Sequence, residues 1–114
     1  MTKHEFDPSN YENWKPSDFP VGYVCPEGGT SEACYTGGWR SDRPMWDPEK
    51  CTNCMLCWMY CPDSSIKIED GAMTGIDLFH CKGCGVCVQE CKFGALHLVS
   101  EAEAQEQDKQ KEGE

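Results

Sequence analysis

Eight cysteines, arranged as two copies of one spacing, constrain this 114-residue chain more than any other feature. Each copy has three cysteines separated by two residues, and a fourth that follows after three more. The first run is Cys51, Cys54, Cys57 and Cys61, and the second is Cys81, Cys84, Cys87 and Cys91. A loop with cysteines three positions apart can wrap around a cubane [4Fe-4S] core and ligate three of its irons. The spacing therefore predicts two [4Fe-4S] clusters, each of which needs one further thiolate.

The fourth ligand of each cluster is expected to come from the other run. In bacterial two-cluster ferredoxins, the last cysteine of each run ligates the cluster that the other run holds. We therefore predict Cys51, Cys54, Cys57 and Cys91 as ligands of cluster one, and Cys81, Cys84, Cys87 and Cys61 as ligands of cluster two. Structural zinc is the alternative, because Cys-x-x-Cys pairs also bind zinc. Two triplets that each have a fourth cysteine exceed what tetrahedral zinc requires.

The two runs belong to an internal repeat in which residues 44–73 align with residues 74–103. Residues 66–68 and 96–98 alternate apolar, polar and apolar, which is typical of a half-buried strand. The turn residues 69–71 predict a hairpin between Ile66–Ile68 and Met73–Ile76. The segment between each fourth cysteine and its strand has room for only about one helical turn. We expect an α+β fold of the bacterial two-cluster ferredoxin type, with a duplicated βαβ core.

The flanks differ from this core and suggest the domain boundaries. The first 43 residues contain four of the seven prolines and five of the eleven glycines, which favours an extended arm without its own core. Residues 100–114 carry six acidic and two basic residues and no apolar stripe, which is typical of a solvated helix or a disordered end. We therefore expect a long irregular N-terminal arm over 1–43, a two-[4Fe-4S] ferredoxin domain over 44–99 and a short acidic tail over 100–114.

Charge and hydropathy exclude several classes of function. With 10 Lys and Arg against 20 Asp and Glu, the net charge of -10 leaves no basic face for nucleic acid. No apolar run approaches the roughly 20 residues of a membrane span. The first 18 residues contain no apolar segment followed by a small-residue cleavage site, which predicts a cytoplasmic protein. In a reducing compartment, cysteines in such numbers indicate metal binding more than disulfides.

The segment that leads into the first cysteine run resembles a known family. Residues 36–44 read Thr-Gly-Gly-Trp-Arg-Ser-Asp-Arg-Pro. They are similar to the delta, ferredoxin-type subunit of 2-oxoacid:ferredoxin oxidoreductases, the pyruvate synthase and phenylglyoxylate dehydrogenase group of anaerobic metabolism. The resemblance covers about residues 28–99.

The resemblance implies an electron-transfer role inside a complex. Its other subunits would bind thiamine diphosphate and coenzyme A and would oxidatively decarboxylate a 2-oxo acid to an acyl-CoA. This chain would carry the electrons through its two [4Fe-4S] clusters to a ferredoxin or another redox acceptor. It has no recognisable nucleophile and base pair, phosphate loop or thiamine site, so we predict no catalytic residues in it.

Two other functions use the same clusters. A free-standing two-cluster ferredoxin would carry electrons between partners, although such a protein needs no arm of 43 residues. A cluster-stabilised assembly module would hold the clusters without changing their oxidation state.

Several residues outside the runs admit two interpretations. Cys25 and Cys34 are expected to be unligated thiols, with a disulfide as the less favoured alternative. The chain's only arginines, Arg40 and Arg43, either make surface salt bridges or anchor the arm to a carboxylate on the core or on another chain.

Comparing the two copies of the repeat indicates which residues around each cluster the fold requires. Met59 and Tyr60 align with Gln89 and Glu90, so the core does not require their apolar side chains, and they are candidates for contact with the arm or a partner subunit. Bulky residues at 55, 56 and 58 and small ones at 83 and 85 predict that cluster two is the less shielded.

Overall fold

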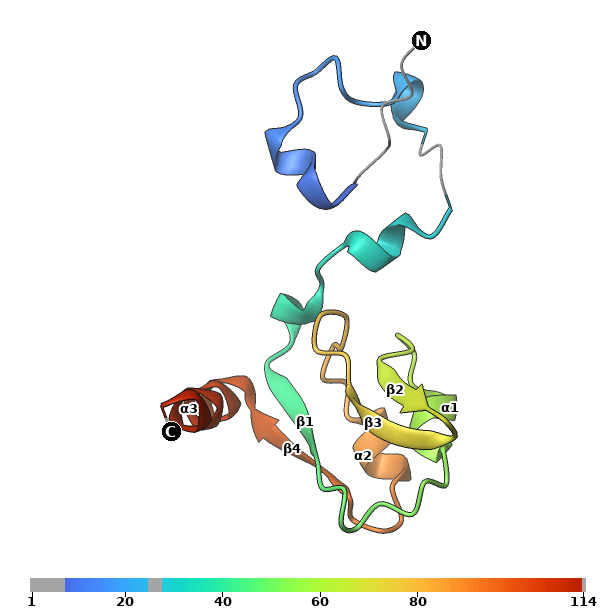
Figure 1. Cartoon of the computed structure of the whole chain (residues 1–114), viewed down its shortest axis with the longest axis vertical. Helices are drawn as coiled ribbons and strands as arrows, with labels where there is room; N and C mark the ends of the chain where they lie inside the picture. The colour runs from blue at the N-terminus through green and yellow to red at the C-terminus, as the bar shows by residue number, and fades with distance from the viewer. Residues whose placement is uncertain (1–7, 25–27, 114) are drawn as a thin grey trace. The chain divides into compact units, whose positions relative to one another are not determined.

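The computed structural model describes residues 8–24 and 28–113, which fall into two units, Met1–Tyr35 and Thr36–Glu114. The described part of the first unit contains three short 3-10 helices: η1 (Pro8–Asn13), η2 (Val21–Tyr23) and η3 (Thr30–Ala33). The elements of the second unit are η4 (Gly37–Trp39), β1 (Asp42–Trp46), α1 (Leu56–Tyr60), β2 (Ile66–Glu69), β3 (Ala72–Ile76), α2 (Val86–Glu90), β4 (Leu96–Ser100) and α3 (Glu101–Glu112) (Figure 1).

Two antiparallel two-stranded sheets frame the second unit. β1 pairs with β4, with Pro44 opposite Leu98, and β2 pairs with β3, with Ile66 opposite Ile76. The hairpin predicted for residues 66–68 and 73–76 is confirmed, with an irregular register after Lys67. The bounds of β1 and β3, and of α1 and α2, recur 30 positions apart. Each sheet therefore takes one strand from each copy of the repeat.

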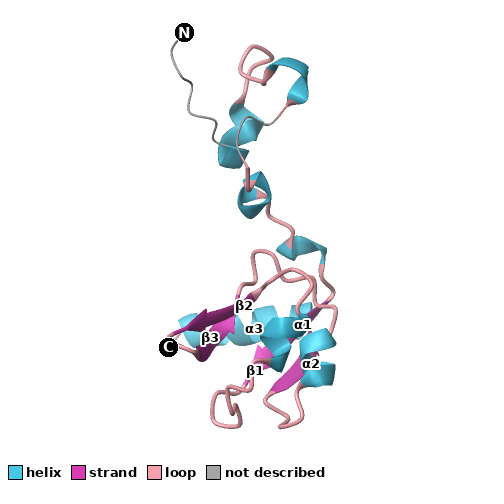
Figure 2. Ribbon diagram, turned by 90° about the vertical axis from the view of Figure 1, so that its right-hand side faces the viewer, coloured by secondary structure: helices cyan, strands magenta, loops and turns pink. Residues whose placement is uncertain are grey.

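The two short helices lie side by side, with α1 against β2 and α2 against β4 (Figure 2). Each helix lies directly before the fourth cysteine of its run. The sequence left room for a helical turn in the segment after that cysteine, and the structure has no helix there. The residue before each helix, Met55 or Gly85, has left-handed backbone angles with φ of 64° and 78°. At this residue the chain turns from the cysteine-bearing loop into the helix. The third cysteine then lies on the helix, and the fourth, Cys61 or Cys91, follows its last residue.

The apolar core is small. Its buried members are Ile66, Met73, Cys87 and Leu96, and partly buried cysteines of both runs pack against them. Burying one large aliphatic side chain contributes about 1.5–3 kcal/mol, so these few residues offset only part of the conformational entropy of the unit. Among the described residues, no helix is long and apolar enough to cross a membrane.

The lead-in to β1 packs against the second cysteine run. The backbone N–H groups of Thr36 and Gly37 both donate to the carbonyl oxygen of Phe79, at 3.1 and 2.7 Å. A Cβ atom on Gly37 would overlap the carbonyl oxygen of Leu78. Because of these contacts, the first unit ends at Tyr35 and not at residue 43, the boundary expected from composition.

An ion-pair cluster fixes the last helix to this lead-in. Arg40 Nε lies 2.7 Å and Arg43 Nε 3.0 Å from Glu101 Oε2, and Arg43 Nη1 lies 2.5 Å from Asp108 Oδ2. The two arginine side chains are only 4% and 8% exposed. Of the two interpretations of these arginines, the anchor is therefore the one observed, but its carboxylates lie on the C-terminal segment and not on the 44–99 core or another chain.

The C-terminal tail is a helix in the structure, the first of its two alternatives, but it is not solvated all round. Ser100 caps it by accepting a hydrogen bond from the Glu103 N–H at 3.3 Å. Ala104 is fully buried. Composition could not show this anchoring, because the helix is held by Glu101 and Asp108 and not by an apolar stripe.

Replacing Gly37 by alanine should destabilise the second unit by about 1–3 kcal/mol, because the new methyl group would meet backbone carbonyls that cannot rotate away. Gly28→Ala is the matched control, since nothing lies near its Cβ position, and it should change stability by less than about 0.5 kcal/mol. The measurement is urea unfolding of the assembled protein, followed by loss of visible cluster absorbance. Equal midpoints for the two variants would contradict the packing described here.

Glu101→Gln should destabilise the protein at neutral pH, with a difference from wild type that disappears in acid. Hydrogen bonds from Arg43, and then from Arg40, lower the pKa of Glu101 from 4.5 to about 2, against the opposing effect of burial. This stabilisation, roughly 3 kcal/mol, is complete above about pH 4.5 and is lost as the pH falls through about 2.

The test is the rate of cluster bleaching after jumps to a series of acidic pH values. The ratio of the Glu101→Gln rate to the wild-type rate should be largest near neutral pH and approach one near pH 2. Glu106→Gln, an exposed change on the same helix, controls for loss of negative charge. A ratio that does not depend on pH would rule out this role of the carboxylate.

Candidate metal centres

Two cavities in the second unit each gather four cysteines. The first has about 380 Å³ of open space and is lined by Cys51, Cys54, Cys57 and Cys91 together with apolar side chains. The second has about 350 Å³ and is lined by Cys61, Cys81, Cys84 and Cys87. Each cavity takes three cysteines from one run and the fourth from the other. The structure thus brings together the same two sets of four that the sequence analysis grouped.

Left-handed residues shape the loop that carries the first cysteines of each run. In the second run these residues are Gly83 and Gly85, with φ of 66° and 78°, and in the first they are Asn53 and Met55, with φ of 56° and 64°. A non-glycine residue in this conformation costs about 1–2 kcal/mol. Asn53 gains a compensating contact, since its side-chain oxygen accepts the N–H of Met73 at 3.0 Å. This hydrogen bond ties the first loop to β3.

Backbone N–H groups point at cysteine sulfurs in the second cavity. Ser65 N–H donates to Cys61 Sγ at 3.2 Å, and Gly83 N–H donates to Cys81 Sγ at 3.4 Å. Such hydrogen bonds favour the charged thiolate, the form that ligates metal.

Burial has the opposite effect on the thiols. Desolvation raises the pKa of Cys57 and Cys81, and raises that of Cys87 to about 11. Like charge adds to this, because the pKa of Cys57 is also raised by Cys51, Cys54 and Cys91, the other thiols of its own cavity. Without a cation these three thiols stay protonated at neutral pH, so metal binding has to displace their protons.

The donor set fits a polynuclear cluster. A tetrahedral zinc site needs four sulfurs about 2.3 Å from one point. The eight thiols instead divide into two sets of four, and each set lines its own cavity among apolar side chains. Within residues 8–24 and 28–113, no group of three or more His, Cys, Asp and Glu converges as ligands of a single metal ion.

One polar atom in this region was missed by the sequence analysis. Trp46 lines the first cavity, and its indole Nε1 is buried with no hydrogen-bond partner among the described residues. The signal was available in the repeat, because Trp46 aligns with Ile76, which lines the second cavity and carries no polar atom in its side chain. An orphaned donor beside four thiols fits a cavity that receives a group with acceptor atoms.

The expectation that cluster two is the less shielded is wrong for its cysteines. Cys81 and Cys87 are buried, each 8% exposed, whereas Cys51 and Cys57 are only partly buried. Neighbours along the sequence predicted the opposite, because they could not show the lead-in packing over the second run. Arg40 Nη1 donates to the carbonyl oxygen of Cys81 at 3.3 Å and fixes this cover.

Of the two cysteines outside the runs, Cys34 is exposed and unpaired in the described structure. Cys25 lies outside the described residues, so the choice between free thiols and a disulfide stays open.

Comparison with known proteins agrees with two sites of four cysteines each. The sequence profile of the 4Fe-4S dicluster domain matches residues 43–92. Pyruvate synthase subunit PorD of Thermotoga maritima is 42% identical over 92 residues, which cover 81% of this chain and 91% of that protein. PorD of Methanocaldococcus jannaschii is 40% identical, covering 71% of this chain and 94% of its own. The delta subunit of NADH-dependent phenylglyoxylate dehydrogenase from Aromatoleum evansii is 41% identical, and the match covers 60% of this chain and 72% of that subunit.

Proposed function

Because the chain belongs to the family of delta, ferredoxin-type subunits of 2-oxoacid:ferredoxin oxidoreductases, we propose that it is the electron-transfer subunit of such a complex. The observation that carries the proposal is the convergence of four cysteines on each of two cavities. A bound [4Fe-4S] cluster accepts and releases one electron at a time. The chain's own residues position the thiols, cover them with apolar side chains and hold the two cavities next to one another.

The lining of the two cavities supports the ligand sets that we propose. Cluster one is held by Cys51, Cys54, Cys57 and Cys91, and cluster two by Cys81, Cys84, Cys87 and Cys61. The domain around them is a duplicated βαβ core of the two-cluster ferredoxin type, between an N-terminal arm and an acidic tail. Supporting this are the matching element bounds in the two copies and the sheets that pair strands from both.

Bond-making chemistry belongs to other subunits. A partner that binds thiamine diphosphate and coenzyme A decarboxylates the 2-oxo acid and forms the acyl-CoA, and an electron pair leaves that reaction. This chain passes the electrons singly to an external ferredoxin or another redox acceptor. It contributes no catalytic residue of its own.

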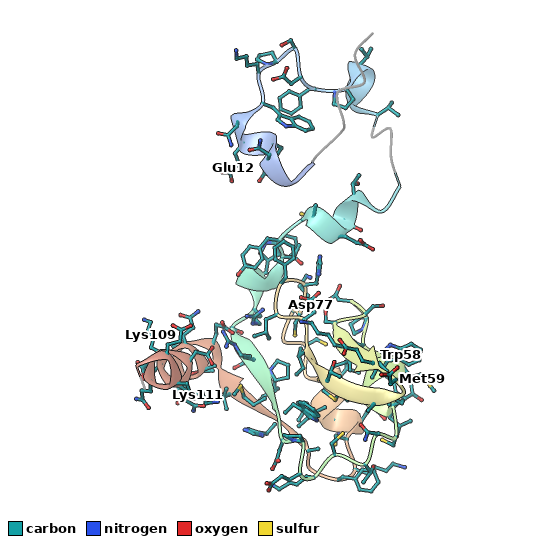
Figure 3. All side chains as sticks on the ribbon, in the orientation of Figure 1. Glu12, Trp58, Met59, Asp77, Lys109 and Lys111 are labelled. Carbon is teal, nitrogen blue, oxygen red and sulfur yellow. The ribbon has the colours of Figure 1, made fainter. Side chains whose placement is uncertain are left out.

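The exposed face of α1 is the surface that we assign to a neighbouring subunit. Trp58, Met59 and Tyr60 are 51%, 63% and 51% exposed, and Figure 3 labels the first two at the outer edge of the second unit. At the equivalent positions of α2 the chain has Val88, Gln89 and Glu90. The fold therefore tolerates polar residues there. Three adjacent large apolar side chains in water fit a surface that is covered in the complex.

The direct test of the function uses the native complex. Adding 2-oxo acid and coenzyme A should reduce both clusters of this chain, seen as electron paramagnetic resonance (EPR) signals at low temperature. Elution of the untagged native chain at the size of a lone ferredoxin would favour a free carrier instead. Clusters that never change oxidation state would favour an assembly module.

Paired cysteine variants test the crossed ligand sets. Wild-type protein should contain about eight iron atoms. If Cys61 serves cluster two, Cys61→Ser with Cys81→Ser removes ligands from one cluster only and should leave about four irons. Cys61→Ser with Cys51→Ser removes ligands from both and should leave almost none. The measurement is iron and sulfide content per folded chain, and the reverse ranking of the two double variants would show that each run holds its own cluster.

A charge on the α1 face should loosen assembly while leaving the clusters intact. Met59→Glu or Tyr60→Glu places a carboxylate in the proposed contact, and we expect at least a tenfold loss of affinity for the partner subunits. Gln89→Glu adds the same charge at the position of α2 that is equivalent to Met59, and it should have little effect. Affinity is measured by reconstitution with the other subunits. Lys82 follows Cys81 in the second run. Normal binding of both α1 variants, with release by Lys82→Glu, would place the contact on the second half.

A further inference from the structure

The unpartnered indole of Trp46 marks a specific interaction with cluster one. Trp46 is the last residue of β1, opposite Leu96 of β4, and its side chain lines the cavity of Cys51, Cys54, Cys57 and Cys91. Its Nε1 is buried, and within residues 8–24 and 28–113 neither an oxygen nor a cysteine sulfur accepts its proton.

A donor in this position needs an acceptor. A buried N–H without a partner loses the hydrogen bonds that it makes with water in the unfolded chain, and buried tryptophans usually satisfy their N–H for this reason. The cavity wall beside Trp46 consists largely of apolar side chains and cysteines. The acceptor that such a cavity receives is then the sulfur of the cluster itself.

We propose that the Trp46 Nε1–H donates a hydrogen bond to an inorganic sulfide of cluster one and thereby raises the reduction potential of that cluster. The inference rests on the proposed function only in that the cavity holds a cluster. Its direction follows from charge: reduction adds an electron to the cluster, so a donor stabilises the reduced form more than the oxidised form. Hydrogen bonds to the sulfurs are among the factors that set cluster potentials.

The repeat supplies the comparison that isolates this effect. Ile76 occupies the same position in the second copy, at the end of β3, and lines the cavity of cluster two. Its aliphatic side chain fills space but donates nothing. The hydrogen bond is therefore specific to one of two otherwise corresponding sites, and it makes the two clusters unequal as electron acceptors.

The experiment is a redox titration of the assembled protein, with each cluster followed by EPR. Trp46→Phe keeps an aromatic ring and removes the donor. At a fixed solution potential, the ratio of reduced to oxidised cluster one should fall about tenfold, equivalent to 59 mV for one electron. Cluster two should keep its potential. Trp39→Phe is the matched control, because it removes the same donor from an indole that is 76% exposed and does not line the cavity, and it should leave the ratio unchanged.

A second measurement needs no variant to fold. In wild-type protein with cluster one reduced, electron-nuclear double resonance should detect a proton coupled to the cluster. This proton signal should disappear in deuterium oxide. Nitrogen-15 labelling of tryptophan should assign it to an indole N–H. A full iron content with no indole proton coupled to cluster one would overturn the hydrogen bond and leave the proposed function standing. An unchanged potential in Trp46→Phe would overturn the tuning, and a chain that binds no iron would overturn the proposed function itself.

Discussion

The convergence of thiols from both halves of the chain is the constraint on which the rest of this structure depends. Each cavity is lined by three cysteines of one run and one cysteine of the other, so both copies of the repeat contribute to each site. Each sheet also pairs a strand of one copy with a strand of the other, because β1 pairs with β4 and β2 with β3. Among the described residues, the central apolar cluster has four buried members, so metal bound to the thiols would supply much of the cohesion.

The lead-in over residues 36–43 is part of this cohesion and not a detached arm. Arg40 joins three segments. It donates to the carbonyls of Leu78, just before the second run, and of Cys81, its first cysteine, and it pairs with Glu101 at the start of α3. A guanidinium has enough donors in a fixed plane to make all these contacts at once, which a lysine does not. The motif that marks the family in the sequence thus covers one metal centre and fastens the C-terminal helix.

The two halves share a backbone plan but differ in what surrounds their metal centres. The first has an indole at the end of its strand and exposed apolar residues on its helix, and the second has an aliphatic residue and polar ones at the same places. The second also has the more buried cysteines. A symmetric pair of clusters would favour neither direction of electron flow. These differences make the two halves of a chain built from a repeat unequal.

The sequence by itself determined the elements that depend on spacing. The cysteine runs, the period of 30 residues and the hairpin of residues 66–76 can all be read locally, because strand alternation and loop ligation act over a few residues. Even the grouping of cysteines across the cavities followed from the runs. Only the tertiary structure decided where the helix of each copy lies, that Glu101 receives both arginines, that the second site is the better covered and that Trp46 Nε1 has no partner. These features come from contacts between residues far apart in the chain. Neither composition nor neighbouring residues in the sequence can predict such contacts.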